Sequence, residues 1–315
     1  MKQTSSPVSQ TETASSPRIS QEVARVAIAR CNLCGSTQTR PFCPENERGL
    51  VQCQSCGLVY VGEQPNAEEL YALYGETYFR NDQSGEVGYS NYIRDEPNIR
   101  KTVRRRFAHV EKFIKPGRMV DVGCAMGFFM DEAARRGWQV EGLDVSQYAV
   151  DYVQRRFGHR AYNGSLTSVD LPQAAYDLVT MYDVIEHVPD PRAYVQRVAE
   201  LLKPGGVFEL ATPDVGSFPA RLTGKRWIGY KLSEEHVYYF SVATLRRMLA
   251  EAGFEVVHVR HIGKYVTLRL FLDRLGFYAP WLSKPLELLE RAFHLSERSF
   301  YVNPFDIVAI TARKL

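Results

Sequence analysis

The segment 120–129, with the sequence VDVGCAMGFF, constrains this chain more than any other, because it has the pattern of a buried strand, a small-residue turn and a helix. Such a turn lets backbone N–H groups approach a ligand closely at the N-terminus of a helix. A second apolar run, 140–144, ends in Asp144, at the separation where nucleotide-binding folds place a carboxylate that binds a ribose. The two features together predict an adenosine-containing ligand.

The glycine pattern does not fit the dinucleotide dehydrogenases, whose G-x-G-x-x-G turn would require glycine where this chain has Ala125 and Phe128. The spacing Asp-x-Gly-x-x-x-Gly, from Asp121 to Gly127, instead resembles motif I of the class I S-adenosylmethionine (SAM) methyltransferases.

The order of the following segments continues this resemblance. A helix at 146–157 precedes an apolar strand at 176–183, and a Glu-His segment then leads into a second helix. That helix ends in the sequence LKPGG at 202–206, and a strand follows at 207–212. The resemblance implies an α/β fold with the Rossmann-like, seven-stranded sheet of class I methyltransferases.

The same resemblance implies a cofactor pocket that binds SAM. In that family the glycine turn approaches the methionine portion, and the acid in the first strand accepts from the ammonium of the ligand or organises the loop. The acid at the end of the second strand binds the ribose, and later segments meet the adenine. The matching residues here are Asp121, Gly123, Cys124, Ala125, Gly127, Asp144, Val145, Ser165, Leu166 and Tyr182.

Four cysteines form two C-x-x-C-G knuckles, separated by residues 35–52. Each knuckle can direct two thiolates at one ion, and the glycine after the second cysteine eases the tight turn. Redox dithiols are the alternative, but they usually lie in a βαβ context that residues 31–57 lack. The pattern predicts a closed, structural zinc site with Cys43 as a spare thiol and these ligands: Cys31, Cys34, Cys53 and Cys56.

The composition along the chain predicts four regions. Residues 1–24 are rich in Ser, Thr, Gln and Pro and are expected to be a disordered tail. A zinc ribbon at 25–65 and a helical connector at 66–116 then precede a SAM-binding domain at 117–315. An insert at 264–303 has the pattern of two aromatic amphipathic helices. Its role is open between a homodimer contact, an extra core layer, a wall for a hydrophobic substrate and a transient membrane contact.

The connector holds two further features. The basic run 100–106 alternates with apolar positions, which is typical of a solvated helix face. The resemblance implies that a helical segment before the first strand covers the cofactor, so Tyr89 and Tyr92 either line the pocket or serve only in packing.

The overall charge and hydropathy limit the partners and the compartment. Lys and Arg number 39 against 36 Asp and Glu, a net charge of +3 that is weak support for a nucleic-acid partner. The chain contains no apolar run long enough to span a bilayer. We therefore expect a cytoplasmic protein that acts on a small molecule.

Two histidines are candidates for the catalytic base. Glu186 and His187 follow the strand at 176–183, and a neutral imidazole suits removal of a hydroxyl proton. The segment also resembles the metal-dependent O-methyltransferases of ubiquinone synthesis, in which Asp183, Glu186 and His187 would match two acids and a histidine. The second candidate is His236, in the long connection after the strand at 207–212. A purely structural histidine is the alternative at both positions.

The combination of ribbon, Tyr-rich connector and core, over about residues 30 to 260, resembles a bacterial family of sugar and natural-product methyltransferases. This resemblance implies SAM-dependent methyl transfer to a saccharide or glycoconjugate hydroxyl, or to a carbon. O-methylation of a phenolic or isoprenoid hydroxyl is the first alternative. An RNA methyltransferase and a non-catalytic SAM-binding module are the others.

Overall fold

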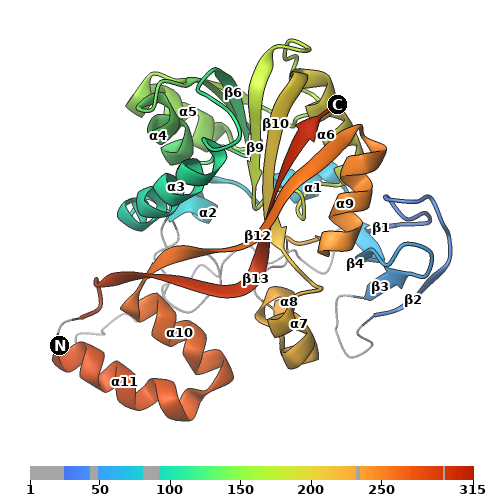
Figure 1. Cartoon of the computed structure of the whole chain (residues 1–315). Helices are drawn as coiled ribbons and strands as arrows, with labels where there is room; N and C mark the ends of the chain where they lie inside the picture. The colour runs from blue at the N-terminus through green and yellow to red at the C-terminus, as the bar shows by residue number, and fades with distance from the viewer. Residues whose placement is uncertain (1–24, 43–48, 81–91, 232–234, 294) are drawn as a thin grey trace, which may run out of the picture.

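The computed structural model describes residues 25–42, 49–80, 92–231, 235–293 and 295–315. The expected tail, Cys43 and Tyr89 lie outside these ranges. The centre of the described part is a seven-stranded sheet with the order β12-β13-β10-β9-β6-β7-β8 (Figure 1). Its strands are β6 (Arg118–Val122), β7 (Gln139–Asp144), β8 (Arg160–Asn163), β9 (Tyr176–Tyr182), β10 (Leu202–Pro213), β12 (Phe254–Thr267) and β13 (Ser299–Lys314). This order confirms the predicted α/β, class I methyltransferase sheet.

Strands β6 to β10 are parallel, and β13 runs antiparallel to both β10 and β12. The carboxyl ends of β6, β7, β9 and β10 therefore meet at one edge of the sheet. In open α/β sheets this edge is where ligands bind. The segments that follow these strands are the ones that the sequence singles out.

Helices cover both faces of the sheet (Figure 1). One face carries α3 (Glu96–Val110), α4 (Phe128–Ala134) and α5 (Gln147–Phe157), and the other carries α6 (Pro191–Leu201) and α9 (Val242–Glu251). Local sequence signals set their ends. Ser146 caps α5 by accepting from the backbone N–H of Ala149, and Gly158 ends it with a φ of 68°. Ser241 caps α9 within a capping box that it forms with Thr244.

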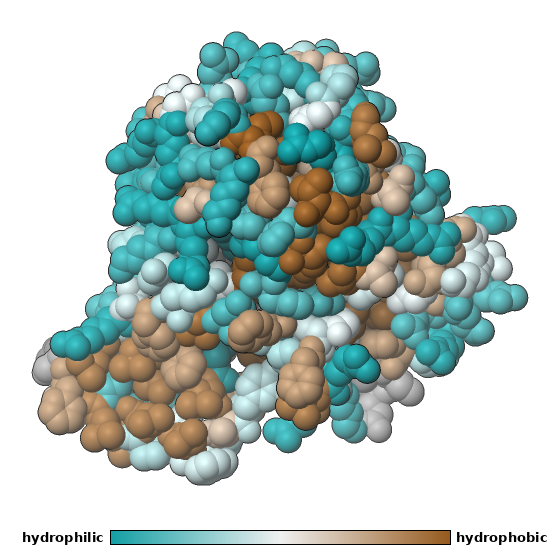
Figure 2. All heavy atoms as spheres, viewed as in Figure 1, coloured by the Kyte–Doolittle hydropathy of each residue, from teal (hydrophilic) through white to brown (hydrophobic). Residues whose placement is uncertain are grey.

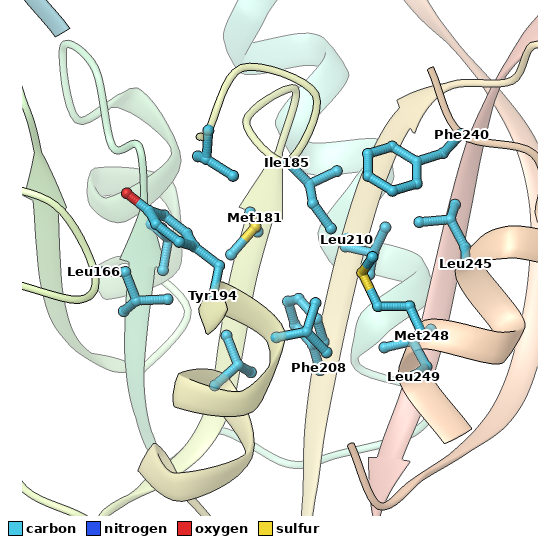
Figure 3. Packing of buried hydrophobic residues seen from close by; sticks show 14 of the residues in the cluster. Leu166, Met181, Ile185, Tyr194, Phe208, Leu210, Phe240, Leu245, Met248 and Leu249 are labelled. Atoms are coloured by element: carbon cyan, nitrogen blue, oxygen red, sulfur yellow. The ribbon is translucent and has the colours of Figure 1, made fainter. Parts of the chain in front are cut away.

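The core between the sheet and the helices α6 and α9 is densely apolar (Figure 3). Met181 and Phe208 of the sheet face Tyr194 of α6 and Leu245 of α9 across this layer. The same buried cluster reaches Cys31 and other residues of the N-terminal ribbon. The ribbon therefore shares one hydrophobic core with the large sheet and its helices α6 and α9.

The ribbon consists of two small sheets. β1 (Arg25–Ala27) pairs with β5 (Glu63–Pro65), while β2 (Thr39–Pro41), β3 (Leu50–Cys53) and β4 (Val59–Val61) form a second sheet. The fourth strand of that second sheet is β11 (Tyr238–Tyr239), which comes from the long connection after β10. A segment almost 180 residues away in sequence thus completes the ribbon.

The connector contains α1 (Ala67–Ala72), α2 (Glu76–Arg80) and the Arg-rich helix α3. The expectation of a solvated basic face was wrong for Arg100 and Arg106, whose side chains are both only 13% exposed. Arg100 forms an ion pair with Glu96 at 2.7 Å and lies over the ring of Phe128. Arg100 contacts Asp131 of α4, and Arg106 lies over the ring of Tyr182 at the end of β9, so packing against neighbouring elements buries both side chains despite their charge.

The insert folds as expected into two helices, α10 (Leu268–Tyr278) and α11 (Pro280–Ala292). The flanking strands β12 and β13 reach far beyond the rest of the sheet, because their pairing continues to Thr267 and Ser299. Gly263 permits this extension, since a side chain there would lie 1.8 Å from the carbonyl oxygen of Val302. The two long strands carry the helices beyond the sheet as a separate lobe (Figure 1).

Three short elements follow β10 beside this lobe: α7 (Phe218–Thr223), the 3-10 turn η1 (Gly224–Arg226) and α8 (Ile228–Lys231). The indole N–H of Trp227 donates to Asp306 of β13 at 3.2 Å, and the backbone N–H of Ile228 donates to the hydroxyl of Tyr278 at 2.8 Å. Within the described ranges, the helices are all too short or too polar to cross a bilayer.

Candidate active site

The turn after β6 adopts left-handed backbone conformations at three positions, with φ values of 71° at Gly123, 47° at Ala125 and 71° at Gly127. The backbone N–H groups of Gly123 and Cys124 both donate to the carbonyl of Leu143, at 2.8 and 3.0 Å. The turn is thereby fixed against the end of β7, and Gly127 forms the N-cap of α4. This is the strand, turn and helix that the sequence predicts.

Asp144 lies at the end of β7 and is buried. Its carboxylate accepts from the backbone N–H of Ala125 and from that of Ser146, each at 2.9 Å. Burial raises the pKa of this carboxyl, and the two N–H donors oppose the rise. Each carboxylate oxygen keeps a second acceptor site, which suits the hydroxyls of a ribose.

Asp121 is the second buried carboxyl of the pocket and accepts from the hydroxyl of Thr180 at 2.7 Å. Burial, with a contribution from the charge of Asp144, raises the pKa of Asp121 to about 7. In the part of the chain that the structure describes, neither carboxylate forms an ion pair. Two buried acids without a cationic partner fit a ligand that carries positive charge.

The segments expected near the adenine lie beside these acids. The amide of Asn163 donates to the carbonyl of Val145 at 3.0 Å, which joins the ends of β7 and β8. The hydroxyl of Ser165 bonds to those of Thr167 and Ser168, and Leu166 is fully buried in the core. Tyr92 stacks on Phe128 with ring centroids 5.8 Å apart, next to the glycine turn.

Cys124 is buried inside the turn, and its side chain packs where a Cβ on Gly142 would lie. Burial raises the pKa of its thiol well above the ordinary value, and the nearby carboxylates add to the rise. A neutral, enclosed thiol is a poor nucleophile. Cys124 therefore serves as a small packing residue in the turn.

The structure brings together the three candidate catalytic residues. One ligand atom each from Glu186, His187 and His236 lies within 4.8 Å of the others. The imidazole rings of His187 and His236 have centroids 4.5 Å apart. Glu186 is 1% exposed, and among the described residues neither of its carboxylate oxygens has a hydrogen-bond partner. Burial, together with the charge of Asp183, raises the pKa of Glu186 well above its usual range.

Backbone and side-chain contacts from distant segments position this cluster. The backbone N–H groups of Val237 and Tyr238 donate to the carbonyl of Glu186, at 2.9 and 3.1 Å. The hydroxyl of Tyr74, in the connector, lies 2.9 Å from Nδ1 of His187. Nε2 of His187 is then the nitrogen that faces Glu186, at 3.9 Å.

The cluster adjoins the glycine turn. A Cβ built on Gly123 would lie 2.4 Å from the Cγ2 atom of Val184, so the turn after β9 packs directly on the turn after β6. Asp183, with a φ of 56°, is half-exposed and lies 3.8 Å from Arg106. Asp183 is therefore not among the three residues whose ligand atoms converge.

Tyr182 ends β9 on the side covered by α3 and α4. Arg106 lies 4.3 Å above its ring, and the centroid of Phe129 is 5.1 Å away. Burial raises the pKa of its phenol well above the ordinary value. Tyr182 is therefore a neutral side chain that packs between Arg106 and Phe129 at the carboxyl end of β9.

The four cysteines of the ribbon converge on one point. Their Sγ atoms all lie within 4.8 Å of one another, and the pairs Cys31–Cys56 and Cys34–Cys53 are both 3.5 Å apart. A disulfide would require about 2.05 Å. A tetrahedral zinc ion with bonds of about 2.3 Å separates its sulfurs by about 3.8 Å. The arrangement matches a four-thiolate site and not a pair of disulfides.

Sequence reasoning missed Tyr74 and Arg106 as members of this site. Both lie in the connector, and only the tertiary fold brings them to the end of β9. The sequence offers Tyr89 and Tyr92 of the connector as lining for the cofactor pocket. Tyr74 lies instead on the side of the histidines.

Comparison with known proteins agrees with this geometry. Residues 92–259, more than half of the chain, match a family model described as a methyltransferase domain. A solved Bacillus halodurans structure, described as a "putative methyltransferase", superposes with a TM-score of 0.51 at 17% identity, covering 67% of this chain and 97% of that one. This likeness supports the fold alone.

Two curated relatives each match a little under half of the chain. The ubiquinone biosynthesis O-methyltransferase of Leptothrix cholodnii is 30% identical over 45% of this chain and 66% of its own length. A "Probable S-adenosylmethionine-dependent methyltransferase" of Mycolicibacterium smegmatis is 34% identical over 44% of this chain and 52% of its own length. The chain thus spans less than two thirds of either relative. With the matching family model and the seven-stranded sheet, these results show that the chain belongs to the class I SAM-dependent methyltransferases.

Proposed function

We propose that this protein transfers the methyl group of SAM to a hydroxyl of a small molecule, with saccharides and glycoconjugates as the first acceptors to test. The observation that carries the proposal is the convergence of Glu186, His187 and His236 next to the glycine turn. A phenolic or isoprenoid hydroxyl is the second acceptor class, and the name of the Leptothrix relative supports it.

SAM, when bound, supplies a methyl group that its sulfonium already activates, so the protein mainly needs to align the acceptor and exclude water. Asp121 would accept from the ammonium of the ligand, and Asp144 would bind its ribose hydroxyls. The left-handed turn from Gly123 to Gly127 would let the chain approach the methionine portion closely.

We propose His187 as the base that removes the acceptor proton. If Nδ1 donates to the hydroxyl of Tyr74, the ring is held in the tautomer whose bare Nε2 faces Glu186 and the acceptor side. Glu186 is buried with its carboxyl 3.9 Å from Nε2, and the charge of the resulting imidazolium would favour the ionised form of this carboxyl, which in turn would stabilise the imidazolium. His236 lies beside this pair and would orient the acceptor or act as the alternate base.

A divalent cation at Glu186, His187 and His236 is the second candidate mechanism. One carboxylate and two imidazoles form a donor set that transition-metal ions accept. In that case Glu186, His187 and His236 would hold the ion, which when bound would supply a lowered pKa of the acceptor hydroxyl.

We further propose that the four-cysteine site holds structural zinc. Four thiolates leave no open coordination position, so the ion would stabilise the ribbon rather than take part in methyl transfer. The left-handed glycines after each knuckle, Gly35 at 73° and Gly57 at 80°, allow the turns that such a site requires.

Two experiments test this function in order. Calorimetric titration with S-adenosylhomocysteine should show binding that Asp144→Ala weakens strongly, with zinc measured in both proteins. Methyl transfer from labelled SAM to panels of saccharides, phenols and prenylated phenols should then be lost in His187→Ala and His236→Ala, but retained in His258→Ala, a histidine outside the cluster.

The outcomes separate the two mechanisms. Activity that survives chelation of weakly bound metal supports His187 as a simple base, whereas activity restored by Mg²⁺ or Mn²⁺ after chelation supports the cation. Wild-type protein that is folded and zinc-loaded but binds no S-adenosylhomocysteine would contradict the whole proposal.

A further inference from the structure

Helix α11 has its polar and apolar faces reversed relative to a helix of a water-soluble monomer. Its large apolar side chains point outward: Trp281 is 77% exposed, and Leu288, Leu289 and the following Phe293 are exposed as well. Ser283 and Glu290 instead lie buried within the lobe, at 2% and 1% exposure. A surface helix of a globular protein turns its apolar stripe toward the core. Figure 2 shows apolar residues gathered on the surface over α10 and α11.

Helix α7 adds a second exposed apolar pair. Phe218 and Leu222, one turn apart, are 75% and 72% exposed. Residues 217–231 contain no Asp or Glu, and Arg221, Lys225 and Arg226 in this segment are exposed. Exposed apolar residues flanked by cations are the pattern of elements that lie in the interface of an anionic membrane.

The two surfaces belong to one end of the molecule (Figure 1). The Trp227–Asp306 and Ile228–Tyr278 hydrogen bonds fix the α7–α8 segment to the lobe. Pro213 ends β10 directly before this segment, so the surface adjoins the edge of the sheet where the candidate active site lies. We call the exposed Phe218, Leu222, Trp281, Leu288, Leu289 and Phe293 the apolar end.

The charges around the apolar end favour lipid over a second copy of the chain. Asp273 of α10 is paired with Arg269 at 3.3 Å and Glu297 with Arg94 at 3.0 Å, whereas Glu290 is buried. Glu287 is the remaining acid of α11, beside the exposed Lys284 and the cationic segment 217–231. A two-fold interface with its axis at α7 would bring the cationic segment 217–231 against its own copy. A bilayer with anionic headgroups instead complements it.

From these observations we propose that the apolar end binds the surface of a membrane that contains anionic lipids. The aromatic and leucine side chains of α7 and α11 would enter the acyl boundary, and Arg221 and Arg226 would meet lipid phosphates. The proposal does not depend on methyl transfer, because membrane binding is measured directly.

Flotation of the full-length, zinc-loaded protein with vesicles tests this surface. We expect binding to vesicles of equal amounts of phosphatidylcholine and phosphatidylglycerol, and binding at least about tenfold weaker to phosphatidylcholine alone. Arg221→Gln with Arg226→Gln, and separately Trp281→Ser with Leu288→Gln, should each weaken binding by about tenfold or more. Leu315→Ser and Val26→Ser, at exposed apolar positions elsewhere, are the matched controls and should bind as wild type does.

Tryptophan fluorescence adds a direct readout of insertion. Trp138 and Trp227 are 4% and 1% exposed, so a blue shift on mixing with vesicles reports Trp281 and should vanish in Trp281→Phe. Titration of each variant with S-adenosylhomocysteine checks that its fold is intact. Vesicle binding that is absent in wild type, or unchanged in both double variants, would overturn the proposal. A dimer in sedimentation that Trp281→Ser with Leu288→Gln converts to a monomer, without vesicle binding, would assign the face to a second copy.

Discussion

The backbone N–H of Val61, in the N-terminal four-cysteine ribbon, donates to the carbonyl of Val237, one residue after His236, at 3.0 Å. Strand β4 of the ribbon pairs with β11 immediately beyond this bond, and Val237 in turn donates to the carbonyl of Glu186. The ribbon is therefore the support on which the histidine cluster is assembled, although its cysteines are not part of that cluster.

This support leads to the first prediction, which concerns removal of zinc. Cys34→Ser should lower the zinc content, and it should lower the thermal midpoint by about 5–10 °C, because a ribbon without its ion holds β4 less firmly in its pairing with β11. Methyl transfer should fall by about tenfold or more, while affinity for S-adenosylhomocysteine changes little because the glycine turn lies on the other side of β9. Cys124→Ser, at a cysteine outside the ribbon, should keep its zinc. A Cys34→Ser protein with full activity would show that β11 keeps its position without the ion.

The second prediction concerns the pH dependence of cofactor binding at Asp121. Its carboxyl pKa of about 7 means that much of the free protein carries a neutral Asp121 below that pH. Binding of a cationic ligand favours the charged form, so affinity for SAM should rise by up to about tenfold per pH unit between pH 6 and 7. Asp121→Asn should bind more weakly and with no such slope. Calorimetry across this range measures both, and an equal slope in Asp121→Asn would assign the titration to another group.

The stability of the unliganded protein should show the opposite trend. The ordinary pKa of an aspartate is 3.8, so the unfolded state releases this proton before the folded state does. The contribution of Asp121 to stability is then full below about pH 4 and is lost as the pH rises towards 7. Saturating SAM should remove this loss.

The third prediction concerns Tyr74, whose hydroxyl lies 2.9 Å from Nδ1 of His187. Burial raises the pKa of this phenol well above its ordinary value, so it stays neutral at working pH. Tyr74→Phe removes one hydrogen bond and little volume, and it should lower kcat by about tenfold without changing the affinity for S-adenosylhomocysteine. It should also move the acidic limb of the pH–rate profile. Tyr78→Phe, at a neighbouring tyrosine, is the control, and an unchanged profile in Tyr74→Phe would exclude an orienting role.

The sequence predicted what depends on local spacing. The glycine turn, the two cysteine knuckles, the helix at 146–157 and the helices of the insert all have signals within a few residues of each other. The burial of Arg100 and Arg106, the contact of Tyr74 with His187 and the pairing of β11 with β4 could not be predicted. They join segments far apart along the chain, and periodicity carries no information about which distant face a helix or strand meets.

The convergence of Glu186 with both histidines could be predicted in part. The sequence placed His187 after one strand and His236 after the next, and parallel strands bring such segments to the same edge. The sequence also favoured Asp183 as the third member of a metal set, whereas the structure brings His236 to the group and places Asp183 near Arg106.

The last prediction tests the packing of the glycine turn on the turn after β9. Gly123→Ala introduces a Cβ at a φ of 71° and 2.4 Å from the Cγ2 atom of Val184, so two separate costs apply. The left-handed backbone costs about 1 kcal/mol for a residue with a Cβ, and the overlap adds about 1–3 kcal/mol of strain. Val184→Ala in the Gly123→Ala background should relieve the overlap and restore part of the stability, while the backbone cost remains. Denaturant unfolding of the wild type, both single variants and the double variant gives the coupling energy. If the two turns pack as described, the double variant is more stable than the sum of the single effects predicts, and simple additivity would show that they do not touch.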